Sequence, residues 1–308
     1  MAAGMEFCLL GPLVVRCGGV VVPVAPGKQR AVLAVLLLNA GRVVGLDELA
    51  ETLWGAGPPP SARVSVQNHV MRLRKGLAVA GQARISTQPG RYLIRVDAGE
   101  LDVSRFEAML GAARVAARDG SWQVAAARAG AALALWRGEP LADAGSEVLA
   151  LREVPRLAEM RLQALEARIE ADLQLAHHAE VIGELRQLAG VHPLREHLHA
   201  LLMLALYRDG RRAEALAAYQ DARRVLVEEL GTEPGTGLRE LQQRILTADP
   251  GLAAAERGRL AAGSREPVVP HQLPGTVRHF TGRAGELTAL TGLPGTAACW
   301  PGGGCWWC

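Results

Sequence analysis

The fold of this chain is decided by the stretch Ser61-Ala-Arg-Val-Ser-Val-Gln-Asn-His-Val-Met-Arg-Leu-Arg-Lys-Gly-Leu77. Four apolar residues recur in it at helical spacing: Val66, Val70, Leu73 and Leu77. Such a single stripe predicts one amphipathic helix from about residue 61 to residue 77, with Ser61 as a candidate N-cap. The apolar stripe is expected to face a core, which leaves the opposite face available for a partner.

That opposite face is polar and basic. At about 100° per residue it consists of Ser65, Asn68, Arg72 and Lys75, and its borders carry Arg63, Gln67 and Arg74. In a DNA major groove, Asn can pair with adenine and Arg with guanine, whereas Lys and the border arginines suit phosphates. An ordinary surface helix usually mixes signs to form i,i+4 ion pairs, whereas this helix contains no acid, so we expect that no acid is available to pair with its basic residues.

The surrounding sequence is also free of acids. From Thr52 to Val96 there is no Asp or Glu, but seven basic residues occur: Arg63, Arg72, Arg74, Lys75, Arg84, Arg91 and Arg95. The net charge of the chain is only +3, yet residues 1–100 hold eleven Lys and Arg against six Asp and Glu. This concentration predicts a polyanionic partner, with a plain solvated face as the alternative. Three of these residues, Arg63, Arg84 and Arg95, are interpreted as general phosphate attraction.

The elements around this helix predict a winged helix-turn-helix over residues 1–100. Strand-like runs cover 6–10, 13–16 and 20–24, and helices are expected from Gly27 to Asn39 and from Asp47 to Trp54. Runs 83–87 and 92–96 predict a hairpin, or wing, with Arg91 near its tip. Lys28 and Arg30 are candidate phosphate contacts, although an exposed helix start explains them equally well.

Beyond Asp102 the pattern is helical to about Leu246. Val181, Leu185 and Leu188 precede Ala215, Tyr219 and Ala222 by 34 residues each, which is the period of tetratricopeptide repeats. The predicted fold class is therefore an α+β winged helix-turn-helix domain followed by an all-α tetratricopeptide-like domain over residues 101–250. Stacked helix pairs of this kind commonly bind protein.

Nothing in the pattern predicts an enzyme, a cofactor or a metal site. No acidic pair, Ser/His/Asp set or activated Cys stands out, and His197 and His199 point in different directions along one helix. The longest apolar runs, 31–38 and 200–207, are far shorter than the ~20 residues that cross a bilayer. Five cysteines without a disulfide framework fit a reducing compartment, so a soluble, cytoplasmic protein is expected.

Several motifs in order resemble one family of regulators. They are Phe7-Cys-Leu-Leu-Gly-Pro-Leu13, Asp47-Glu-Leu-Ala-Glu-Thr-Leu-Trp54, Pro89-Gly-Arg-Tyr-Leu93, Trp136-Arg-Gly-Glu-Pro-Leu-Ala-Asp143 and His192-Pro-Leu-Arg-Glu196. Over residues 5–250 the chain resembles the SARP family, the Streptomyces antibiotic regulatory proteins, with an OmpR-type winged helix and a bacterial transcriptional activation domain.

The resemblance implies an activator of a secondary-metabolite gene cluster. Its expected partners are direct repeats in double-stranded promoter DNA, RNA polymerase holoenzyme and a second copy of the chain, and its expected place is the nucleoid. It also implies that Ser65, Asn68 and Arg72 read bases, and that Arg74, Lys75 and Arg91 hold the DNA backbone. Met71 is less polar than a base reader needs and is a candidate for contact with a thymine methyl group.

Residues 251–308 depart from the family pattern. Gln272–Leu290 is similar to the entry of the nucleotide-binding domain of AfsR-type members, but the chain contains no G-x-x-x-x-G-K-[ST] phosphate loop. We expect a linker and a disordered remnant, produced by a truncation or frameshift. Cys305-x-x-Cys308 with Cys299 supplies only three zinc ligands.

Two other functions remain open from the sequence. The helical repeats could form a protein-interaction scaffold that carries a vestigial DNA-binding domain. An ATP-dependent switch is the third alternative, and it requires the phosphate loop that the chain lacks.

Overall fold

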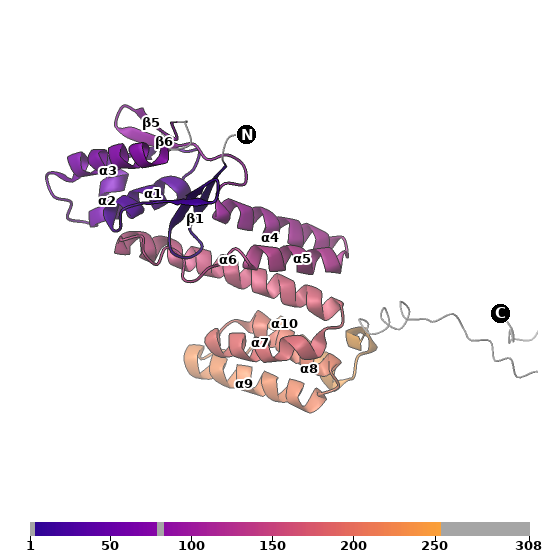
Figure 1. Ribbon diagram of the computed structural model, residues 1–308. Coiled ribbons are helices and arrows are strands. Elements are labelled where there is room, and N and C mark those ends of the chain that lie inside the picture. The colour runs from indigo at the N-terminus through magenta and orange to yellow at the C-terminus, as the bar shows by residue number, and fades with distance from the viewer. Residues whose placement is uncertain (1–3, 79–82, 254–308) are drawn as a thin grey trace, which may run out of the picture. The chain divides into compact units, whose positions relative to one another are not determined.

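The computed structural model describes residues 4–78 and 83–253 (Figure 1). The chain begins with an antiparallel sheet of β1 (Met5–Cys8), β2 (Val14–Cys17) and β3 (Val20–Val22), in that order. Gly18 and Gly19 turn the chain between β2 and β3 with φ angles of 57° and 83°, which glycine adopts without steric cost. The three predicted strands are confirmed, and each boundary lies within two residues of its predicted position.

Three helices follow, as the sequence predicts: α1 (Lys28–Leu38), α2 (Leu46–Trp54) and α3 (Ala62–Leu77). α1 is buried along most of its length, which fits its nearly continuous apolar sequence, and it packs against both α2 and α3. Ser61 is the N-cap of α3 as predicted, although its side chain makes no capping hydrogen bond. The apolar stripe of α3 is buried, so the predicted orientation of this helix is confirmed.

The wing belongs to a second sheet of β4 (Val44–Gly45), β5 (Ile85–Gln88) and β6 (Arg91–Ile94), with β6 in the middle. The hairpin of β5 and β6 is the predicted one. β4 is not predicted, because two residues are too short to show the alternation of a strand. The chain passes directly from β4 into α2, which therefore begins one residue before the predicted start at Asp47.

A buried carboxylate joins the first sheet to α4 (Asp102–Arg118). Asp102 is 4% exposed and accepts hydrogen bonds from the backbone amides of Leu9 and Leu10, at 2.8 and 2.9 Å. Burial raises the pKa of Asp102, and the amides of Leu10 and Leu9 oppose that rise. The Phe7 amide donates to the carbonyl oxygen of Glu100 at 2.7 Å, so the residues just before α4 lie beside β1.

The first hydrophobic core extends across the predicted domain boundary at residue 100. It includes Phe7 and Ile94 from the strands, Phe106 from α4, and Leu157 and Ala164 from α6 (Glu147–Gln174). α5 (Trp122–Leu133) packs between α4 and α6. The division into two domains at residue 100 stays a prediction. Residues on both sides of that boundary share one hydrophobic core.

A second core lies among α7 (His178–Val191), α8 (Glu196–Arg208), α9 (Arg212–Leu230) and α10 (Thr236–Leu246), with a short 3-10 helix at Pro250–Ala253. The six positions related by the 34-residue period face this core, and only Leu188 is partly exposed. Both α7 and α9 pack against α8. The predicted helical repeat is confirmed, and no strand is found within residues 102–253.

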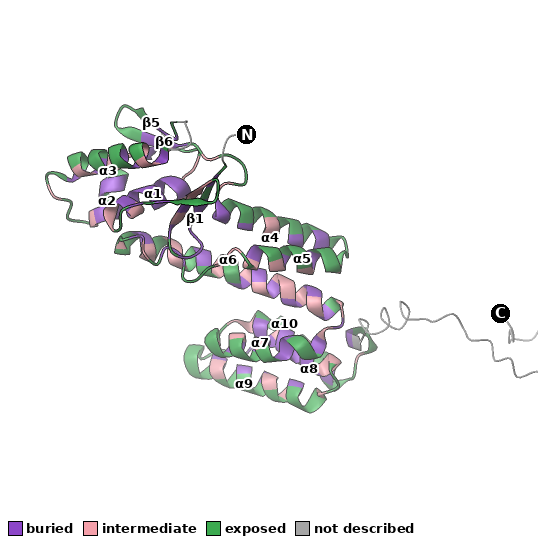
Figure 2. Ribbon diagram, in the orientation of Figure 1, coloured by how far each residue is buried: buried purple, intermediate pink, exposed green. Residues whose placement is uncertain are grey.

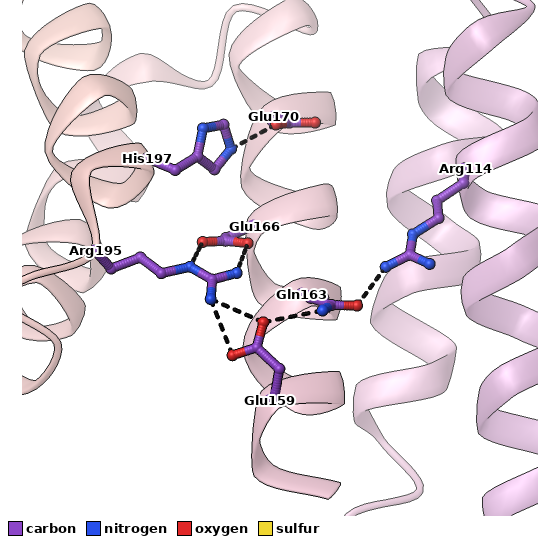
Figure 3. Close-up of polar contacts among 7 residues, drawn as sticks. All are labelled: Arg114, Glu159, Gln163, Glu166, Glu170, Arg195 and His197. Atoms are coloured by element: carbon purple, nitrogen blue, oxygen red, sulfur yellow. Dashed lines mark hydrogen bonds and ion pairs between the residues drawn. The ribbon is translucent and has the colours of Figure 1, made fainter. Parts of the chain in front are cut away.

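α6 contributes to both cores and carries a set of ion pairs on its polar side (Figure 3). Arg195, just before α8, donates to Glu166 at 2.8 and 2.9 Å and to Glu159 at 2.8 and 2.9 Å. Its hydrogen bonds to Glu166 are the main reason that the pKa of Arg195 is raised. His197 lies 2.7 Å from Glu170, further along α6. These contacts hold α8 against α6.

Replacement of Asp102 should destabilise the fold strongly. Asp102→Ala leaves the amides of Leu9 and Leu10 buried without an acceptor, and we expect a loss of roughly 2–4 kcal/mol in the free energy of unfolding. Urea denaturation measures the change. Asp119→Ala, at the exposed far end of α4, is the matched control and should change stability by less than about 0.5 kcal/mol. An equal effect of the two variants would contradict the role assigned to Asp102.

The pair of His197 and Glu170 should make stability depend on pH. The hydrogen bond to Glu170 raises the pKa of His197, so the folded state binds the proton more tightly than the unfolded state. The stabilisation is fully present below the ordinary histidine pKa of ~6.5 and is lost as the pH rises through the raised pKa. His197→Ala should therefore lower stability by about 0.5 kcal/mol at pH 5.5 and by much less at pH 9, since both side chains are half exposed.

Urea denaturation at the two pH values tests this prediction. Glu170→Gln is the companion variant, because it keeps the size of the side chain and removes its charge. It should show the same pH-dependent loss of stability as His197→Ala. A loss that is the same at both pH values would show that His197 stabilises the fold by packing alone.

Candidate nucleic-acid interface

The polar face of α3 is open to solvent (Figure 2). Asn68, Arg72 and Lys75 are exposed, and Ser65 is half-buried near the start of the helix. The face is exposed because the opposite stripe, from Val66 to Leu77, is at most 2% exposed in the first core. The structure thus brings the four central site residues onto one side of one helix, as the sequence predicts.

Two of these residues carry unneutralised charge. Within residues 4–78 and 83–253, Arg72 and Lys75 form no ion pair and no hydrogen bond to a protein side chain. Asn68 and Gln67, also exposed, have no protein partner for their amide groups in the same residues. Groups in this state present donors and positive charge to whatever approaches the helix.

Arg63 is placed differently from the prediction that no acid is available to this helix. Its guanidinium donates to both carboxylate oxygens of Asp47 in α2, each at 2.9 Å. Asp47 lies just before the acid-free window in sequence, and the helix-turn-helix packing brings it to α3. The prediction is wrong on this point: Arg63 has a bidentate partner, which a phosphate contact would have to share.

Arg74 connects α3 to the wing. It donates to the carbonyl oxygen of Ile85 at 2.9 Å and to the hydroxyl of Thr87, and its guanidinium lies 6.0 Å from the ring centroid of Tyr92. These contacts fix the wing relative to the helix. A direct contact between Arg74 and DNA stays a prediction.

Arg91 is exposed on the wing, at the first position of β6. Its partner across the hairpin is Gln88, and Gly90 makes the turn with a φ of 69°. Arg95 is also exposed, directly after β6. The wing therefore presents positive charge at its tip and at its base.

The interpretation of Arg84 as general phosphate attraction is wrong. The residue is 7% exposed and donates to Glu100 at 2.9 Å and to Asp97 at 3.0 Å. Both acids lie just after the acid-free window. A buried guanidinium needs such partners, and here they hold the base of the wing to the segment that leads into α4.

Lys28 and Arg30 have partners within the chain. The Lys28 ammonium lies 3.7 Å above the ring of Trp54, and Arg30 donates to the carbonyl oxygen of Val24 at 3.2 Å and pairs with Asp143. Both residues are half-buried, so the alternative interpretation, an exposed helix start, does not account for these contacts either. Their contact with phosphates stays a prediction.

His69 lies at the border of α3 and contributes no charge to this face at neutral pH. Burial lowers its pKa, and the nearby charges of Arg72 and Lys28 lower it further. Its Nδ1 atom is buried without a hydrogen-bond partner among the described residues. The positive charge of the exposed face therefore comes from Arg72 and Lys75.

Val64 is a surface residue that the sequence interpretation leaves out. It is 58% exposed, and Met71, two turns further along the same side of α3, is 61% exposed. The angular argument could have found it, because at about 100° per residue Val64 lies only 20° from Met71. A criterion restricted to polar residue types does not select this valine.

The described residues also bear on metal sites and on membrane spans. No group of three or more His, Cys, Asp or Glu residues is placed to hold a metal ion there. None of the described helices is both long and apolar enough to span a membrane. The cysteine-rich end and the segment similar to a nucleotide-binding domain lie outside the described residues.

Comparison with known proteins accounts for both halves of the chain. Residues 24–91 match the family model "Transcriptional regulatory protein, C terminal", and residues 101–246 match "Bacterial transcriptional activator domain". In a search of solved structures, the chain is similar to Mycobacterium tuberculosis EmbR in complex with a low-affinity phosphopeptide. The TM-score is 0.77 and the identity 35%, over 84% of this chain and 71% of that one.

Two regulators from Streptomyces illustrate the extent of the similarity. The chain is 42% identical over 302 residues to the regulatory protein AfsR of Streptomyces coelicolor, which covers 96% of this chain and 30% of AfsR. It therefore spans less than a third of that relative. It is also 41% identical over 256 residues to the regulatory protein DnrI of Streptomyces peucetius, covering 80% of this chain and 94% of DnrI. The chain belongs to the SARP family of transcriptional regulators.

Proposed function

We propose that this regulator binds short direct repeats in promoter DNA and contacts RNA polymerase, and that it thereby activates a secondary-metabolite gene cluster. The observation that carries the proposal is the exposed face of α3, where Asn68, Arg72 and Lys75 have no partner among the described residues. A helix with unpaired amide and guanidinium groups beside a basic wing fits the winged form of DNA recognition.

The base-reading residues in this proposal are Ser65, Asn68 and Arg72, with Gln67 at the border. Asn68 suits adenine, since its amide can donate and accept at one base edge, and Arg72 suits the two acceptors of guanine. Both are exposed on a helix whose other face is fixed in the core. Because the core already holds the backbone of α3 in place, less conformational entropy is lost when these residues bind DNA.

The remaining basic residues are proposed to contact phosphates in two ways. Lys75 and Arg91 are exposed and without an ion pair in the described residues, so they can meet the backbone directly. Arg63, Arg74, Lys28 and Arg30 already have protein partners, and we propose that they contribute positive potential around the interface and hold its parts in place.

The helical region is proposed to mediate contact with RNA polymerase holoenzyme and pairing with a second copy of the chain. Helix pairs stacked around one core, as in α7 to α10, commonly bind protein. We place the protein in the cytoplasm, associated with the nucleoid, and propose that it acts by binding and not as an enzyme. Membership of the SARP family, the Streptomyces antibiotic regulatory proteins, supports an antibiotic gene cluster as the target.

Arg72 and Lys75 should contribute to binding in different ways. Arg72→Ala should weaken binding to the preferred duplex by ~1–3 kcal/mol and relax the sequence preference, because a base contact is lost. Lys75→Ala should weaken binding to all duplexes alike and lower the salt slope by about 1, because one phosphate contact is lost. Titrations of preferred and scrambled duplexes at several salt concentrations measure both effects.

Arg128→Ala is the matched control for these titrations. Arg128 is an exposed arginine on α5, away from α3 and the wing, and its loss removes the same charge. It should leave affinity and salt slope unchanged. Unchanged binding by Arg72→Ala and Lys75→Ala together would contradict the proposed orientation of α3 on DNA.

The second candidate function is a protein-interaction scaffold with a vestigial DNA-binding domain. The extended helical core favours it. The two candidates separate on the ratio of specific to non-specific affinity. Equal affinity for every duplex, together with no stimulation of purified RNA polymerase at a bound promoter, would favour the scaffold.

A further inference from the structure

Two apolar side chains lie in the middle of the surface proposed to meet DNA. Val64 is 58% exposed and Met71 is 61% exposed, and both belong to α3. They are seven residues apart, so they lie on the same side of the helix about two turns from each other. Asn68 lies four residues after Val64 and three before Met71, and Lys75 lies four residues after Met71. Both therefore belong to the same line.

Neither helix propensity nor burial explains why apolar side chains stand exposed at these two positions of α3. A valine in a helix has lower intrinsic propensity than alanine, because its branched Cβ restricts χ1 against the preceding turn. At more than half exposure, neither side chain gains the stabilisation of full burial in a core. The line Val64, Asn68, Met71, Lys75 therefore alternates apolar and polar groups on an outer face.

The neighbouring contacts fix where this line can point. The stripe from Val66 to Leu77 is buried on the far side of the helix. Arg63 is held to Asp47 of α2, and Arg74 is held to the wing. With these two arginines fixed at one border, the line that contains Asn68 is the part of α3 that can enter a groove.

A major groove offers one apolar group to such side chains, the C5 methyl of thymine. We propose that Val64 and Met71 each contact a thymine methyl, on either side of the base pair that Asn68 reads. The inference rests on the proposed function and extends it to the kind of sequence bound. At about 1.5 Å per residue the two side chains are about 10 Å apart along α3, so they are expected to meet thymines of different base pairs.

Removal of single methyl groups from the DNA tests this contact. The full chain is first used to select its preferred site from a random duplex library. Each thymine of that site is then replaced in turn by deoxyuridine, which keeps the base pair and lacks the C5 methyl. We expect two positions where affinity falls about fourfold, the effect of one buried methyl-sized group.

Protein variants assign each position to a side chain. Val64→Ala should abolish the deoxyuridine effect at one position and Met71→Ala at the other. Both variants replace exposed residues with a better helix former, so they are expected to fold. Val124→Ala, a half-exposed valine of α5, is the matched control and should keep both effects.

The outcomes separate this inference from the proposed function. Selection of a preferred site, with no deoxyuridine effect at any thymine or with effects that persist in Val64→Ala and Met71→Ala, would overturn the methyl contacts and leave sequence-specific binding intact. Failure to enrich any site would overturn the proposed function and the methyl contacts together.

Discussion

The carboxylate of Asp102 is the contact on which the arrangement of the first core depends. It satisfies the amides of Leu9 and Leu10 where β1 ends, and it stands at the first turn of α4. A buried amide without an acceptor is costly, so the chain between β1 and β2 has to run past the start of α4. With that end fixed, the strands, α1 and the first helices of the activator region close around one set of apolar side chains.

The features predicted from sequence are those set by local pattern. The helical stripe of Val66, Val70, Leu73 and Leu77 defined α3 and its exposed face, because a helix of known period places each residue on a known side. The hairpin of the wing and the 34-residue repeat rest on equally local signals. β4 could not be predicted, because two residues carry no strand pattern of their own and this strand is defined by its pairing with β6.

The partners of individual arginines could not be predicted in this way. Arg63 pairs with Asp47 and Arg84 with Glu100. Each acid lies 16 residues away, outside the acid-free window. Packing of α2 against α3, and of the wing against the segment before α4, creates these pairs. A run of basic residues therefore overstates how much of its charge is free for a partner.

The shared core has a consequence for the exchange of parts between relatives. Phe7, Ile94 and Phe106 lie in one apolar cluster with Leu157 of α6, although the two family models divide the chain before residue 101. A chimaera joined at that point would confront the strands of one protein with the α4 to α6 surface of another. The DNA specificity proposed for α3 and the wing is therefore more safely transplanted by grafting their outer residues into an unchanged scaffold than by swapping the first hundred residues as a block.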